Sequence, residues 1–179
     1  MFNKRKMFIP SAFLLTGFLG VTAANAQGPA CPYSLATLQG NYAIIGTYGS
    51  NIAIALGTRY FDGGGNMTGN AIINEPTPGS ATGARTIVTA TQVGTYTVNC
   101  DGTGIITRIV TSGGVSTPQM DNFIITGTTQ ASPGAALIAS SLVDAQQTPS
   151  TIVAGGIFLT RAYTRLPPPV YCGACFQTN

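Results

Sequence analysis

Apolar or β-branched residues alternate with small or polar residues along most of the chain from residue 41 onward. This period of two is typical of β-strands that bury one face. In residues 52–61, for example, Ile52, Ile54, Leu56 and Tyr60 alternate with small or polar neighbours. The ranges with a strand pattern are 41–48, 52–61, 67–74, 85–92, 94–99, 104–111, 122–129 and 152–164. The ranges 85–92 and 94–99 can also be read as one long strand bent at Gly94.

Two glycine-rich turns, at residues 62–66 and 99–104, separate neighbouring strand ranges. Each contains an Asp-Gly pair between two β-rich runs, which is the strongest short-range signal for a hairpin. The stretch 75–83 contains two prolines and is expected to form a loop, as is the stretch 113–121.

Residues 135–147 fit either a helix or a strand. Leu137, Ser141, Leu142 and Ala145 have helix-compatible spacing, but the flanking segments are strands, so we predict a strand here too. A short helical turn is expected at residues 34–39, and a bulge at Gly155-Gly156.

The strand ranges together predict the fold class. They amount to about eight or nine short strands, and no alternation of strands with helices indicates a parallel sheet. We therefore predict an all-β protein built as a single antiparallel barrel of about eight strands. A β-sandwich is the alternative.

The first 26 residues have the features of a secretory signal peptide. A basic start at residues 4–6 precedes an apolar core at residues 7–21, and Ala24-Asn25-Ala26 fits a cleavage site. We expect a mature domain of residues 27–179, with a proline- and cysteine-containing tail from about residue 166, and no membrane span. The protein would then be exported to the periplasm, the cell surface or the medium.

The composition of the expected mature chain excludes several kinds of chemistry. It has no Lys and no His, so Ser-His-Asp and Cys-His catalysis, imidazole metal ligands and Schiff-base formation are all ruled out within the chain. Five arginines balance five acidic residues, and no basic patch suited to nucleic acid is visible. We expect neither a metal nor another cofactor, and consider an enzyme less favoured than a non-enzymatic protein. The charged residues are Arg59, Arg85, Arg108, Arg161, Arg165, Asp62, Glu75, Asp101, Asp121 and Asp144.

The four cysteines are Cys31, Cys100, Cys172 and Cys175. In an exported chain they are expected to form disulfides. Three pairings are open, and we favour Cys31–Cys100 with Cys172–Cys175. The C-x-x-C spacing of the second pair also suits a redox site, but its place in a proline-rich tail favours a structural link.

Arg161 is the most informative candidate for a site. It is in phase with Ile157, Leu159 and Tyr163, which are expected to face inward, so its guanidinium would lie inside the barrel or at its mouth. A buried arginine needs carboxylate or carbonyl partners. It could anchor an anionic or carbonyl-bearing ligand, or clamp the barrel internally, which we favour. Arg108 raises the same question, and Tyr163 is a further candidate ligand-binding residue.

Two weaker candidates concern the turns and the tyrosines. Asp62 and Asp101 could mark calcium loops, but one carboxylate per turn is little for a hard cation, and turn chemistry accounts for both. Five tyrosines could line a cavity or pack in the core: Tyr42, Tyr48, Tyr60, Tyr96 and Tyr163.

Three short motifs occur in order: Leu38-x-Gly40-x-Tyr42, then residues 61–66, then residues 94–99 followed by Asp-Gly-x-Gly. The chain resembles, over about residues 31–161, a family of small exported bacterial proteins of unknown function. The resemblance implies a calycin-like or allene-oxide-cyclase-like barrel. The family often has Asp-Cys at the second turn, where this chain has Cys100-Asp101. No catalytic residues carry over.

Three functions remain open from the sequence. The first is a non-enzymatic binding or structural protein of the cell envelope. The second is a lipocalin-like carrier of a small apolar molecule, and the third is an enzyme similar to allene oxide cyclase. The volume of any internal cavity would separate the first from the other two.

Overall fold

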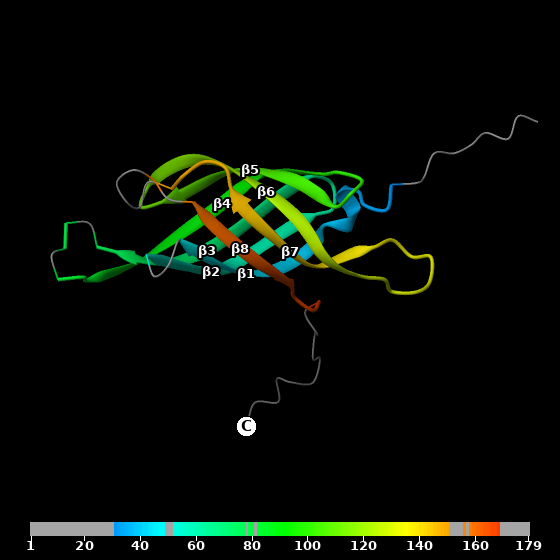
Figure 1. The fold of residues 1–179 in the computed structure, drawn as a ribbon, viewed down its shortest axis with the longest axis horizontal. Coiled ribbons are helices and arrows are strands. Elements are labelled where there is room, and N and C mark those ends of the chain that lie inside the picture. Colours follow the sequence, from blue (N-terminus) through cyan, green and yellow to red (C-terminus); the bar gives the residue numbers. More distant parts are fainter. Residues whose placement is uncertain are drawn as a thin grey trace, which may run out of the picture. The chain divides into compact units, whose positions relative to one another are not determined.

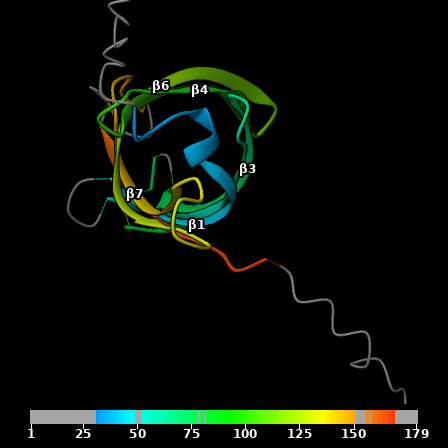
Figure 2. The same cartoon turned by 90° about the vertical axis from the view of Figure 1, so that its right-hand side faces the viewer.

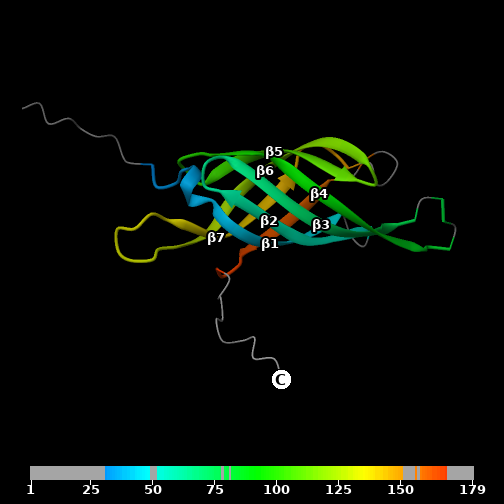
Figure 3. The ribbon, with the colours of Figure 1, turned by 180° about the vertical axis from the view of Figure 1, so that it is seen from behind.

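The chain closes into a single antiparallel β-barrel of eight strands (Figure 1). The structure is a computed structural model that describes residues 31–48, 52–77, 79–80, 82–150, 156 and 158–168. Each strand pairs with the next along the chain, as the neighbouring strands β1 to β4 illustrate in Figure 3, and β8 pairs with β1 to close the ring. The strands are β1 (Gln39–Tyr48), β2 (Ala53–Asp62), β3 (Asn66–Pro76), β4 (Arg85–Val98), β5 (Thr103–Ser112), β6 (Val115–Thr129), β7 (Ile138–Gln146) and β8 (Leu159–Arg165). The predicted barrel is confirmed, and the sandwich alternative is wrong.

Most strand boundaries follow the sequence pattern, with one clear exception. The uncertain segment is strand β7, and β4 runs as one strand through Gly94. The loop expected at 113–121 is wrong, because β6 already begins at Val115. Gly113 and Gly114 both have positive φ, which allows a two-residue hairpin turn, so the strands pair directly after it.

A single-turn 3-10 helix, η1 (Leu35–Thr37), lies across one end of the barrel (Figure 2). The Tyr96 hydroxyl holds it by donating to the carbonyl oxygens of Leu35 and Leu38, at 3.1 and 2.7 Å. Leu38 itself is fully buried. The Cys31–Cys100 disulfide, as predicted, joins this segment to the β4–β5 turn. The η1 end of the barrel is therefore closed.

The interior has two halves with different side chains. Near η1, Tyr42, Phe61 and Tyr96 make edge-to-face contacts, with ring centroids 5.6 and 5.1 Å apart. Toward the other end, the inward positions carry mainly small residues. This second cluster comprises Tyr48, Ala53, Ala55, Ala71, Ile73, Ala90 and Leu159. Large rings fill the closed half, whereas alanines leave space in the other half.

The two aspartates of the turns have structural roles. Asp62 Oδ1 accepts from the backbone N–H of Gly64 and of Asn66, at 2.7 and 2.9 Å. Asp101 Oδ1 accepts from the Thr103 N–H at 3.0 Å. Hydrogen bonds lower the pKa of both carboxyls: the bond from the Asn66 side chain contributes most for Asp62, and the bond from the Thr103 hydroxyl contributes most for Asp101. They are the self-capping contacts expected of such turns.

The outer wall of the barrel is apolar and hydroxyl-rich, and its exposed charges lie only at or near the ends of the described strands. Five of the charged residues lie inside, and the others sit at or near strand ends. In β2 three large side chains face outward: Ile54 is 46% exposed, Leu56 62% and Tyr60 46%. The inward face of β2 instead carries Arg59 and Phe61. Tyr60 therefore neither packs in the core nor lines the interior, so this part of the tyrosine prediction is wrong.

Several predictions concern residues outside the described ranges: the signal peptide, Gly155, Ile157, and the tail with Cys172 and Cys175. Among the residues that the structure describes, no helix is long and apolar enough to cross a membrane.

Candidate functional site

Five charged side chains meet in the middle of the barrel, one from each of five strands. Each stands at an inward position of its strand, in alternation with apolar neighbours such as Phe61, Ile106 or Phe123. All are at most 4% exposed. The five are Arg59 on β2, Arg108 on β5, Asp121 on β6, Asp144 on β7 and Arg161 on β8. We refer to them as the charged cluster.

Asp121 receives two arginines. Arg108 binds it in two-point fashion, with Nε 2.7 Å from Oδ2 and Nη2 3.2 Å from Oδ1. Arg161 Nη2 lies 2.5 Å from Asp121 Oδ1. The two Arg108 contacts are charged hydrogen bonds, which are among the stronger polar contacts in proteins, whereas the Arg161 contact is an ion pair without hydrogen-bond geometry.

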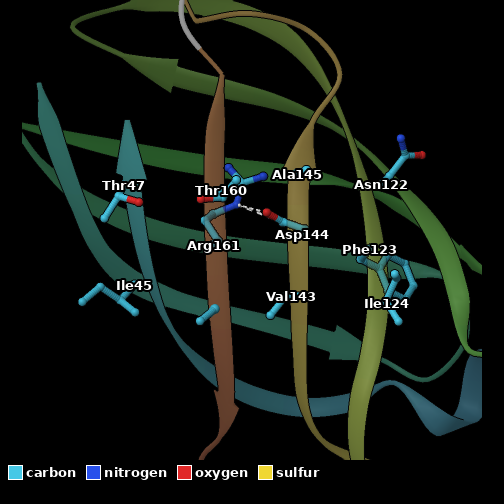
Figure 4. A pocket seen from close by; sticks show the side chains of 11 residues that line it. Ile45, Thr47, Asn122, Phe123, Ile124, Val143, Asp144, Ala145, Thr160 and Arg161 are labelled. Carbon is cyan, nitrogen blue, oxygen red and sulfur yellow. Dashed lines mark hydrogen bonds and ion pairs between the residues drawn. The ribbon is translucent and has the colours of Figure 1, made fainter. Parts of the chain in front are cut away.

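Asp144 is the second centre of the charged cluster. Arg161 Nε lies 2.9 Å from its Oδ2 (Figure 4), and Arg59 Nη1 lies 3.3 Å from the same oxygen. The Tyr163 hydroxyl also donates to Asp144 Oδ2. Arg161 therefore bridges both carboxylates, and the cluster links five of the eight strands.

Burial and the neighbouring charges set the protonation of these groups. Burial raises the pKa of the Tyr163 hydroxyl, which keeps it a neutral donor. Burial also lowers the pKa of Arg59 to about 10. For Asp121, burial alone would raise the pKa, but Arg161 and Arg108 outweigh it and hold the pKa below its usual value. Asp121 and Arg59 are thus charged at neutral pH, and the Tyr163 hydroxyl is neutral.

The charged cluster is not balanced. Three guanidinium groups face two carboxylates, so the formal charges of the cluster leave one excess positive charge. Arg59 Nε donates to Gln92 Oε1 at 3.0 Å, but Arg59 Nη2 is buried and has no partner within the described part of the chain. Arg108 uses Nε and Nη2 on Asp121, and no described residue accepts a hydrogen bond from its Nη1.

A cavity of about 320 Å³ lies on the side of the cluster away from η1. Arg108, Arg161 and Gln92 stand among its lining residues, together with Tyr48 and Glu75. Burial raises the pKa of the Tyr48 hydroxyl, so it too remains a neutral hydrogen-bonding group. The apolar wall comprises Ile44, Ala55, Ala71, Ile73, Val88, Val110, Val115 and Leu159. The cavity thus combines an apolar wall with a cationic group.

The sequence placed some members of this site and missed others. Arg161, Arg108 and Tyr163 all point inward and belong to the site or contact it. Arg59, Asp121 and Asp144 were not singled out. The sequence does carry a signal for Asp121 and Asp144, because each is in phase with an inward apolar residue, Phe123 or Leu142. It carries none for Arg59, because the apolar side chains of β2 suggested that the opposite face of that strand points inward.

A larger hollow, of about 560 Å³, lies on the outer face of β1, β8, β7 and β6 (Figure 4). Its lining includes the outward side chains Ile45, Ile124, Val143 and Ala162, which stand opposite one another across the four strands. Asp144 and Arg161 belong to the lining of this hollow, but their charged groups are buried inside the barrel and pair with each other. The charged groups of the cluster therefore adjoin the interior cavity and not this outer hollow.

The fold and the site define a class: a closed antiparallel β-barrel with a charged cluster across its middle and a cavity on one side of it. This architecture is compatible with the calycin-like fold that the sequence motifs suggest. No protein-family model, curated protein or solved structure matches the chain. Within the described residues, no group of three or more Cys, Asp or Glu side chains could hold a metal ion.

Proposed function

We propose that the protein is an exported, non-enzymatic carrier of a small molecule with an apolar body and one anionic group. The ligand would occupy the interior cavity, with the anionic group against Arg108. The observation that carries the proposal is that a cavity with an apolar wall ends at an arginine whose Nη1 has no hydrogen-bond partner among the described residues.

The volume of the cavity suits such a ligand. Ligand sites in proteins usually start at about 300 Å³ and are lined mainly by apolar groups with a few placed polar ones. At about 320 Å³ the cavity lies at the lower end of that range, which fits a small molecule better than a long lipid. The alanines at residues 55 and 71 help to leave this volume unfilled.

The charge at the inner end of the cavity favours an anion. Arg108 is 3% exposed, and its two-point contact with Asp121 directs Nε and Nη2 toward that carboxylate. In a planar guanidinium, Nη1 then lies on the opposite side. An anionic oxygen there would neutralise the excess positive charge of the cluster. Glu75 is half-buried in the cavity lining, and its carboxylate would repel an anionic ligand. Replacing it by a neutral residue should therefore strengthen the binding of an anion.

The proposal is tested by titrating the purified protein with octanoate and with 1-octanol, using calorimetry. We expect octanoate to bind at least tenfold more tightly, because a charged hydrogen bond contributes about 1.5–3 kcal/mol. Arg108→Met should remove the preference, and the cluster then holds equal numbers of arginines and aspartates. Arg85→Met, at the exposed start of β4, is the matched control.

Each outcome is informative. Tighter octanoate binding by Glu75→Gln would strengthen the proposal. Equal binding of both compounds would disprove the anionic anchor but leave a carrier of neutral molecules. If neither compound binds and native mass spectra show no co-purifying molecule, the carrier proposal is wrong, and a structural role in the cell envelope is then favoured.

A further inference from the structure

A second hollow, separate from the interior cavity, lies on the outer face of β1 to β4. It has a volume of about 320 Å³. Its outward-facing lining residues adjoin one another across the strands: Thr58 pairs with Asn70, Asn70 with Thr91, and Tyr60 with both Asn41 and Thr68. The lining is completed by Gly69 and Gln92. Four strands thus bring six neutral polar side chains to one place.

These side chains are not engaged with one another. Among the described residues, none of the six makes a side-chain hydrogen bond. They are Asn41, Thr58, Tyr60, Thr68, Asn70 and Thr91.

Elsewhere on the outer wall, similar groups do pair. Thr111 bonds to Ser116, and Thr126 to Ser141, at 2.8 and 2.9 Å. The lining of this hollow therefore offers an unusual density of free hydroxyl and amide groups.

The second feature of the hollow is an aromatic ring. Tyr60 is 46% exposed, whereas most of the aromatic side chains that the structure describes are buried. An exposed tyrosine provides a flat apolar surface with a polar tip. No charged side chain lines the hollow. A ligand for this surface would need an apolar face to stack on the ring and several neutral groups that both donate and accept hydrogen bonds.

We propose that this hollow is a carbohydrate-binding site, which we call the Tyr60 site. A sugar ring has hydroxyl groups around its edge and C–H groups on its faces, so it matches both features. Amide and hydroxyl side chains donate and accept, as each sugar hydroxyl does. Because the site lies on the outside of the barrel, it remains open to a polymer such as a cell-envelope or extracellular polysaccharide. It is independent of the interior cavity.

The test measures retention of the full mature protein on suspended cellulose, chitin and starch, with octyl-coated agarose as a probe for non-specific apolar adhesion. We expect retention on at least one polysaccharide, and release by soluble oligosaccharides of the same sugar. Tyr60→Ala should reduce retention at least tenfold, and Asn70→Ala should reduce it measurably. Tyr60→Phe should keep most of it, because the ring remains.

Phe158→Ala is the matched control, since Phe158 is an exposed aromatic residue outside the Tyr60 site. It should leave retention unchanged. The proposal is overturned if no polysaccharide retains the protein, if Tyr60→Ala and Phe158→Ala behave alike, or if octyl-agarose retains the protein as well as the polysaccharides do. Circular dichroism and thermal melting confirm that each variant is folded.

Discussion

Arg108 and Asp121 form a two-point ion pair inside the barrel, with Nε 2.7 Å from Oδ2 and Nη2 3.2 Å from Oδ1. This pair fixes the plane of the guanidinium and leaves its third nitrogen on the side away from the aspartate, where no residue that the structure describes accepts a hydrogen bond from it. One contact therefore does two things: it stabilises a carboxylate in the core, and it orients a cation at the end of the cavity.

The charged cluster should respond unequally to the loss of its members. In Arg161→Met, Asp121 keeps Arg108 and Asp144 keeps Arg59, so each carboxylate still has one arginine. In Asp144→Asn, three arginines face one carboxylate. Breaking a buried pair so that a charge is left uncompensated costs about 3–5 kcal/mol. We expect Asp144→Asn to lose about this much and Arg161→Met clearly less.

Urea unfolding of the two variants measures this difference. Gln147→Ala, at an exposed position next to β7, is a control that should change little. If both variants lose the same free energy of unfolding, the balance of charges does not determine how much each side chain of the cluster contributes to stability. An unchanged or higher melting temperature for Arg161→Met would contradict the role of Arg161 as an internal clamp. It would support the alternative that Arg161 anchors a ligand.

The stability of the barrel should depend on acid pH through Asp121. Its pKa in the folded protein lies below the usual value, so between the folded and unfolded pKa values the native state binds fewer protons than the unfolded chain. The stabilising effect is fully present above the unfolded pKa of about 3.9 and is lost as the pH falls through the folded pKa. The free energy of unfolding should decline below about pH 4. Asp121→Asn should show a shallower decline, and an identical slope would contradict the assignment.

The Cys31–Cys100 disulfide should contribute substantially to stability. It joins residues separated by 69 positions, and closing a loop of that length in the unfolded chain corresponds to about 4 kcal/mol. The double variant Cys31→Ser/Cys100→Ser should lose up to this amount in urea unfolding. Non-reducing peptide mapping of the wild-type protein should find the linked peptides. Free thiols at both positions in the native protein would contradict the pairing.

Gly104 should not tolerate a side chain. A Cβ atom there would collide with the carbonyl oxygen of Thr97 and the ring of Phe123, inside the packed half of the barrel. Overpacking of this kind usually costs about 1–3 kcal/mol. Gly104→Ala should therefore lower the melting temperature, whereas Thr107→Ala, on the outer face of the same strand, should change it little. Similar melting temperatures for the two variants would contradict the packing argument.

The sequence by itself determined the strands and turns of this protein. Alternation with a period of two is a local property, and Asp-Gly turns restrict the backbone locally. Strand β7 and the antiparallel order followed from the same reasoning. Residues 113–121 were misread because Pro118 suggested a loop, whereas Gly113 and Gly114 form a tight turn that lets β6 begin at once.

For β8 the phase of Leu159, Arg161 and Tyr163 already indicated the inward face, but for β2 only the tertiary structure decided it. In β2, Ile54, Leu56 and Tyr60 face outward and Arg59 faces inward, because closure of the barrel gives every strand one inward face regardless of its polarity. Arg59 is tolerated there because β6, β7 and β8 supply Asp121, Asp144 and Tyr163. These partners are 62 or more positions away in the sequence, so no local pattern could show them. Alternation fixes the spacing of side chains along a strand, but a buried charge depends on partners that only the closed barrel brings together.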